Sequence, residues 1–174
     1  MTIPTTTAGG TTGSRGTRIL GTVTLVGVAV TFWLAFVASP ADRVQGDAVR
    51  ILYVHVPSVT VAYLACVVTT VASGVWLKRR TEWWDLVASA SAEIATVLTA
   101  VTLVTGMVWG EATWGTWWEW DARLTSTLFL FLLLVGYQGL RAATPDREVR
   151  GRRSAIVGLL LVPNVIVVNR SVEW

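Results

Sequence analysis

Residues 86–108 read LVASASAEIATVLTAVTLVTGMV, and residues 109–121 read WGEATWGTWWEWD. The first stretch is long enough to cross a bilayer as a helix, because about 20 apolar residues span the ~30 Å hydrocarbon core. Other apolar runs follow the same pattern, at residues 19–38, 53–77, 124–140 and 155–168. Backbone polar groups in lipid must be satisfied within their own segment, so we expect an all-α integral membrane helical bundle with five transmembrane helices.

The composition places the chain in the membrane class. Of its 174 residues, 53% are hydrophobic and 14% are charged, whereas an ordinary soluble domain has about 25% charged residues. The net charge of +3 does not indicate nucleic-acid binding, because the basic residues gather in short loops between the apolar runs. The chain has a single cysteine, Cys66, and a single histidine. An intrachain disulfide is therefore impossible, and a zinc or iron–sulfur site is not expected.

The distribution of Lys and Arg predicts the orientation in the membrane. Ten of these residues fall on one side of the predicted spans, and the positive-inside rule places that side in the cytoplasm. The outer side has four: Arg43, Arg50, Arg123 and Arg170. We expect residues 1–17, rich in Thr and Gly, to form a disordered cytoplasmic tail. Residues 18–174 then form the transmembrane domain, with an outer tryptophan-rich loop at residues 109–123.

Tryptophan is concentrated in that loop. Five of the ten tryptophans lie within residues 109–120, a density that favours a platform for a large, flat, apolar ligand with a polar edge, such as a porphyrin. If residues 114–121 are helical, four side chains share one face: Trp114, Trp117, Trp118 and Asp121. Trp109 and Trp120 complete the candidate set, and an aromatic belt at the membrane interface is the alternative interpretation.

His55 is a candidate ligand for haem iron, because neutral imidazole is a common axial ligand. Pro57 predicts a helix start or kink beside it. The residues alone leave open a hydrogen-bonded histidine at a helix end. Arg50 and Arg123 could clamp ligand carboxylates through their guanidinium groups, or they could be interfacial side chains, with Arg123 paired to Asp121.

Glu93 lies within a predicted span, where a carboxylate is costly and usually faces protein or a cavity. A bond to Ser or Thr of a neighbouring helix is the structural interpretation, and no chemical role follows from the sequence. Cys66 and Met107 are interpreted as packing residues. Nucleophile–base pairs, phosphate-binding glycine loops and paired catalytic carboxylates are not recognisable, so no enzymatic activity is predicted.

Three motifs, in this order along the chain, resemble one known family. The first is Gly46-x-x-x-Arg50-Ile-x-Tyr53-x-His55-Val-Pro57. The second is Trp109-Gly-x-x-x-Trp114-Gly-Thr-Trp117-Trp118-x-Trp120-Asp121-Ala-Arg123-Leu-Thr125, and the third is Ser171-Val-Glu173-Trp174. Together they are similar to the cytochrome c maturation protein C (haem exporter protein C) family of tryptophan-rich, WWD-signature haem-handling proteins.

The resemblance implies a six-helix, multi-pass protein of the bacterial inner membrane with both termini in the cytoplasm. Such a protein is a non-catalytic subunit of an ATP-binding-cassette haem export complex, with further membrane and ATP-binding subunits. It presents haem b, bound as cargo, at the outer face to a membrane-tethered haem chaperone for cytochrome c assembly. In the family, haem lies between the tryptophan-rich loop and two outer histidines, and His55 matches the first.

The family's second histidine follows the Ser-Val-x-Trp motif, whereas this sequence ends at Trp174. We therefore expect an incomplete sequence that lacks the second histidine and the sixth helix. Two alternatives remain from the residues: a cytochrome c synthase-type haem attachment protein, and a small transporter or quinone-binding subunit in which Glu93 would be the informative residue.

Overall fold

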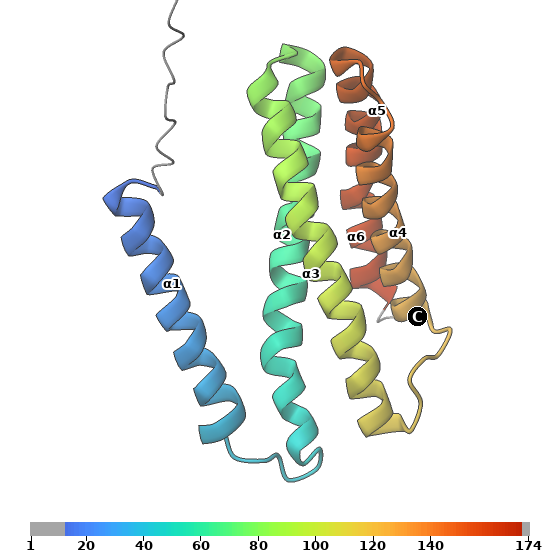
Figure 1. The fold of residues 1–174 in the computed structure, drawn as a ribbon. Coiled ribbons are helices and arrows are strands. Elements are labelled where there is room, and N and C mark those ends of the chain that lie inside the picture. The colour runs from blue at the N-terminus through green and yellow to red at the C-terminus, as the bar shows by residue number, and fades with distance from the viewer. Residues whose placement is uncertain (1–12, 172–174) are drawn as a thin grey trace, which may run out of the picture. The chain divides into compact units, whose positions relative to one another are not determined.

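The computed structural model describes residues 13–171, and the regular elements of this range are helices (Figure 1). Five helical segments of this range are long and apolar enough to cross a membrane: Arg15–Ala38, Asp47–Arg79, Glu82–Trp114, Ala122–Ala142 and Arg147–Arg170. The predicted all-α bundle with five spans is thus confirmed. Residues 1–12 of the predicted tail lie outside the described residues.

The chain divides into two compact units, Met1–Pro40 and Ala41–Trp174. The first unit contains α1 (Arg15–Trp33), which continues as the π-helical η1 (Leu34–Ala38). The helix begins at Arg15 because the Ser14 hydroxyl accepts the Thr17 N–H as an N-cap. The tail predicted over residues 1–17 therefore ends too late, since residues 15–17 are helical.

The second unit contains the other four spans. The 3-10 helix η2 (Asp47–Ile51) leads into α2 (Leu52–Arg79), and α3 (Glu82–Trp114) returns beside it. α4 (Ala122–Ala142) is followed by α5 (Arg147–Leu159) and α6 (Leu161–Arg170), which together form the fifth span. Both α2 and α4 pack against α3, α5 and α6 (Figure 1).

Small residues bring α2 and α3 close together. α2 buries Ala62, Ala65 and Ala72, and α3 buries Ala88, Ala92 and Ala95. Small side chains let backbones approach in a membrane, where packing and hydrogen bonds replace the hydrophobic effect as the driving force. A hydrogen bond of 2.8 Å joins the hydroxyls of Thr69 and Ser91 across this interface. Cys66 is fully buried in the same core, in agreement with its predicted packing role.

Two prolines shape the helices around them. Pro163 lies in the first turn of α6 and cannot donate to the Leu159 carbonyl, so the fifth span is interrupted at Leu160 between α5 and α6. The Leu160 N–H instead bonds to the Val157 carbonyl at 3.0 Å, a tighter turn. Pro57 lies inside α2, so of the two predicted alternatives the helix start is wrong and the kink stays a prediction.

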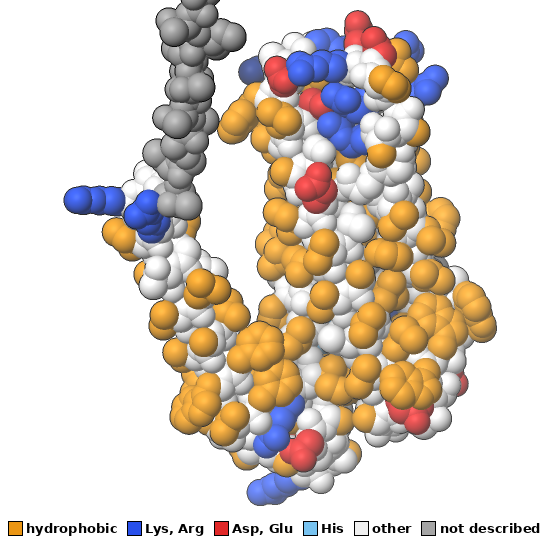
Figure 2. All heavy atoms as spheres, viewed as in Figure 1, with side chains coloured by type: hydrophobic (Ala, Val, Ile, Leu, Met, Phe, Trp, Pro, Cys, Tyr) orange, Lys and Arg blue, Asp and Glu red, His pale blue; other side chains and the backbone are white. Residues whose placement is uncertain are grey.

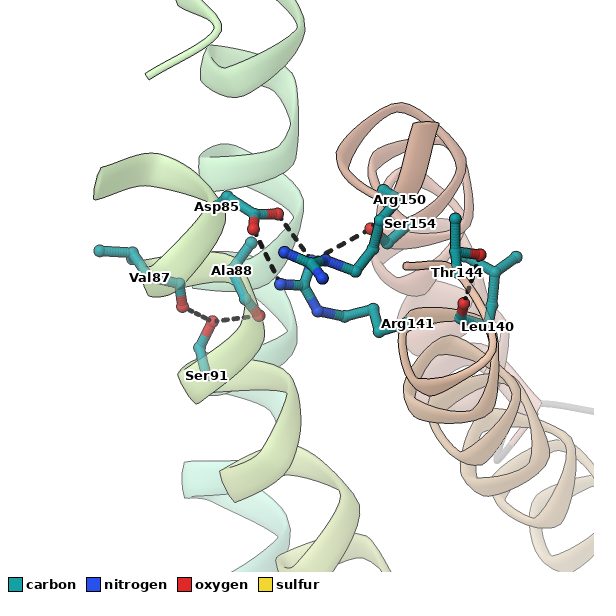
Figure 3. A network of polar contacts seen from close by, with 9 residues as sticks. All are labelled: Asp85, Val87, Ala88, Ser91, Leu140, Arg141, Thr144, Arg150 and Ser154. Carbon is teal, nitrogen blue, oxygen red and sulfur yellow. Dashed lines mark hydrogen bonds and ion pairs between the residues drawn. The ribbon is translucent and has the colours of Figure 1, made fainter. Parts of the chain in front are cut away.

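Charged side chains gather at one end of the second unit, where α2 meets α3 and α4 meets α5 (Figure 2). There Arg141 of α4 makes a bidentate ion pair with Asp85 of α3, with N–O distances of 2.6 and 2.9 Å. Arg141 also donates to the Ser154 hydroxyl of α5 at 3.1 Å (Figure 3). The two charged side chains are only 11% and 15% exposed, so this network joins three helices.

Glu93 lies on α3 with its side chain exposed. Within the described part of the second unit this carboxylate therefore does not face a neighbouring helix, and the expectation that it faces other protein stays a prediction. Its neighbours Ile94 and Val97 are exposed as well, so Glu93 belongs to an outward face of the helix.

Candidate functional site

Two adjoining cavities lie at the end of the second unit that is opposite the charged network. The larger has a volume of about 510 Å³ and the smaller about 240 Å³. Both are lined by His55, Gly106, Arg123 and Leu124. The start of α2, the end of α3, the start of α4 and the end of α6 thus converge here, and the larger volume is in the range of small-molecule sites.

His55 stands in the first turns of α2 and is partly buried. Its Nδ1 lies 2.9 Å from Oγ1 of Thr105 on α3. Gly106 leaves room for the ring, since a Cβ at that position would come within 3.3 Å of His55 Cε1. The facing helix therefore fixes the imidazole at the wall shared by the two cavities.

The tryptophan-rich segment has a different shape from the predicted one. α3 continues to Trp114, and Gly115 ends it with a φ of 73°, the left-handed conformation that glycine adopts readily. Residues 115–121 are irregular, and the Asp121 carboxylate begins α4 by accepting the Leu124 N–H at 2.6 Å. The hypothesis of a helix over residues 114–121 with four side chains on one face is therefore wrong.

The five indoles divide into separate groups. Trp109 and Trp114 meet edge to face with ring centroids 4.9 Å apart, and both line the larger cavity with Asp121 and Arg123. Trp118 and Trp120 make a second edge-to-face pair at 5.4 Å in the irregular loop. The structure thus brings two of the predicted indoles beside His55.

Three predicted indoles lie outside the lining of that cavity. Trp117 and Trp120 are 54% and 76% exposed, and Trp118 buries an indole N–H without a hydrogen-bond partner. Gly110 lets the loop return over α3, because a Cβ there would come within 3.2 Å of the Thr116 carbonyl oxygen. A ligand role for Trp117, Trp118 and Trp120 stays a prediction.

The two candidate cations are in different surroundings. Arg123 is exposed on the first turn of α4 and lines both cavities. Arg50 lies on η2, where its guanidinium is 3.3 Å from the Asp47 carboxylate, and the lining of the two cavities does not include it. The geometry favours Arg123 as the cation for an anionic ligand group.

A turn at residues 42–45, which was not predicted from the sequence, contacts Trp109 of the site. The Asp42 carboxylate accepts the N–H groups of Val44 and Gln45 at 2.8 and 2.9 Å, and these bonds, that of Gln45 first, hold the Asp42 pKa below its usual value. Gln45 in turn accepts the Trp109 indole N–H at 3.4 Å. An Asp whose carboxylate accepts the N–H two residues later is a turn signal that can be recognised in a sequence. The contact between Gln45 and Trp109 cannot be recognised there, because it joins distant parts of the chain.

The residues at the larger cavity fit a porphyrin. A porphyrin supplies four ligands to its own iron, so one imidazole suffices as an axial ligand. Trp109 and Trp114 offer apolar ring surface, and Arg123 offers a guanidinium that suits a carboxylate. The cavity therefore combines the three kinds of group that such a ligand requires.

Comparisons with known proteins show which family this chain resembles. Residues 6–174 match the family model described as Heme exporter protein C. The chain is 41% identical to Heme exporter protein C of Escherichia coli strain K12, over 82% of this chain and 58% of that protein. It is 38% identical to the Haemophilus influenzae protein of the same name, over 88% and 61%, and 45% identical to that of Paracoccus denitrificans, over 63% and 46%.

The matched region is thus about three fifths of the length of the first two relatives. The similarity extends over 82% and 88% of this chain. The chain belongs to the Heme exporter protein C family.

Proposed function

We propose that this chain is the haem-binding membrane subunit of a cytochrome c maturation, or haem export, system. In this role it is not an enzyme: it holds haem b as cargo at the outer face of the bacterial inner membrane. A membrane-tethered haem chaperone then receives the haem for cytochrome c assembly. Further membrane and ATP-binding subunits complete the complex.

One observation carries the proposal. His55, Trp109, Trp114 and Arg123 come from three different helices and line a single cavity of about 510 Å³. An axial ligand, aromatic surface and a cation are otherwise unrelated features, and their convergence favours one flat, anionic, iron-containing ligand. The name of the matched family supports haem as that ligand.

Each residue has a distinct task in this proposal. His55 supplies the axial nitrogen, and Trp109 and Trp114 exclude water from the porphyrin face. Arg123 pairs with a propionate. Asp121 accepts the Leu124 N–H and so fixes the first turn of α4, which carries Arg123. Because Trp114 is 59% exposed, the ligand would keep an open edge, which suits transfer to another protein.

The experiment is the substitution His55→Ala in protein purified from haem-replete cells through a tag without histidine. We expect loss of copurified haem, and recovery of haem binding when imidazole is added to fill the space of the missing ring. Val56→Ala is the matched control, because Val56 is the next residue and is 52% exposed. Unchanged haem content and absorption spectrum in His55→Ala would reject the assignment.

A further inference from the structure

We propose that Thr105 is a positioning residue that sets the tautomer of His55 and leaves Nε2 as the nitrogen available to iron. This inference rests on the proposed function for its link to haem, whereas the tautomer itself is a property of the chain without ligand.

The inference starts from three distances around one hydroxyl. Thr105 Oγ1 lies 2.7 Å from the Val101 carbonyl oxygen and 3.2 Å from that of Thr102. The same oxygen lies 2.9 Å from Nδ1 of His55. Both side chains are partly buried, so the contact is shielded in part from competing water.

Counting the available protons identifies the donor in each hydrogen bond of the Thr105 hydroxyl. A carbonyl oxygen has no proton to give, so an oxygen–oxygen distance of 2.7 Å requires the hydroxyl proton of Thr105 to point toward the Val101 carbonyl. The hydroxyl has only that proton, and it can therefore only accept at its contact with His55. The proton between them must belong to the imidazole, which places it on Nδ1.

Neutral imidazole has a single N–H, so a proton on Nδ1 leaves the lone pair on Nε2. Metal-bound histidines commonly donate their other ring N–H to a fixed acceptor, which orients the ring and raises its basicity. Thr105 supplies such an acceptor from α3, and Gly106 next to it provides the space that the ring occupies.

The first test determines the tautomer of His55 in the haem-free protein. His55 is the one histidine of the chain, so ¹⁵N-histidine labelling gives two ring-nitrogen signals that belong to a single residue. For the haem-free protein above the titration range of the ring, we expect a protonated Nδ1 and an unprotonated Nε2. A protonated Nε2 would overturn the inference, and this result is independent of whether haem binds.

The second test changes the acceptor. Thr105→Val replaces the hydroxyl by a methyl group of similar size, and Thr105→Ser keeps it. We expect Thr105→Val to give a mixture of tautomers and to weaken haem retention about tenfold, the lower end for loss of a partner behind a metal-bound histidine. Thr105→Ser should restore both properties.

The matched control is Thr96→Val, also on α3, whose hydroxyl donates to the Ala92 carbonyl at 2.7 Å. It removes a comparable helix hydrogen bond away from His55, so it reports any general effect of the substitution on folding. Equal tautomers and equal haem retention in Thr105→Val and wild type would contradict the positioning role. Loss of haem in His55→Ala together with an unaffected Thr105→Val would reject this inference alone.

Discussion

At the scale of single residues, surroundings rather than residue type separate the candidate ligands. Arg50 and Arg123 carry the same guanidinium, but the Arg50 group faces the Asp47 carboxylate whereas Arg123 lines both cavities. Sequence reasoning could name both because arginine suits carboxylate ligands, but it could not rank them. Thr105 was missed for the same reason, since its role depends on a contact 50 residues away in the chain.

Arg123→Gln should weaken haem retention about tenfold or more, because a hydrogen bond to a charged group contributes about 1.5–3 kcal/mol. Arg123→Lys should lose less. Hemin titration of the purified protein, followed by its absorption, measures the dissociation constant. Arg43→Gln, which removes an exposed cation outside both cavities, is the control and should bind like wild type; an unaffected Arg123→Gln would remove this residue from the site.

At the scale of helices, the five spans were predictable because hydropathy and length alone determine them. The end of α3 was predictable in principle: Gly115 and Asp121 are strong stop and start signals, yet helical spacing of the tryptophans suggested a helix across them. The Asp85–Arg141 pair was not predictable, because its partners lie on different helices and only their packing brings them together.

Gly158→Ala should destabilise the packing of α5 against α2. The added Cβ would clash with Ser73 Oγ and lie 3.2 Å from Ser73 Cβ, and such overpacking costs about 1–3 kcal/mol. A lower thermal unfolding midpoint in detergent measures this, and Ser73→Ala in the same chain should recover part of the loss. Gly136→Ala is the control, since nothing lies within 4 Å of its Cβ; an equal midpoint for both glycine variants would contradict the packing.

Asp85→Leu should destabilise the second unit strongly, because it leaves the shielded Arg141 guanidinium without its carboxylate; breaking a buried pair costs about 3–5 kcal/mol. The double variant Asp85→Leu/Arg141→Leu should be more stable than Asp85→Leu alone. Denaturant unfolding in detergent compares them. The control is the exposed ion pair between Arg147 and Glu82, whose side chains are 78% and 68% exposed. Arg147→Gln should change the free energy of unfolding by only about 0–1 kcal/mol. Equal effects of Arg147→Gln and Asp85→Leu would contradict this account.

At the scale of the whole molecule, the second unit has two chemically distinct ends. Lys and Arg gather around the end of α2 and the end of α4, together with the Asp85 network (Figure 2). His55, near the start of α2, and the tryptophan-rich segment, between α3 and α4, lie at the other end. Positive-inside charge bias is a property of many loops together, so it could be predicted from the sequence before any contact was known. The same bias predicts that the cavities face outward.

This orientation is testable with single cysteines in a Cys66→Ala background. Glu119 and Arg152 are both exposed, at the tryptophan-rich and the basic end respectively. In intact spheroplasts, a membrane-impermeant maleimide should label the cysteine of Glu119→Cys and should label that of Arg152→Cys only after permeabilisation. The reverse pattern would place the haem site in the cytoplasm and contradict the proposed presentation at the outer face.

The measurement that tests the central claim most directly is the coupling between haem iron and the single histidine. Electron–nuclear double resonance of the ferric, haem-loaded protein should show a nitrogen coupling that changes when ¹⁴N-histidine is replaced by ¹⁵N-histidine, because His55 is the one histidine of the chain. A spectrum without any isotope-dependent coupling would show that His55 does not bind the iron, and the account of this cavity as a haem site would fail.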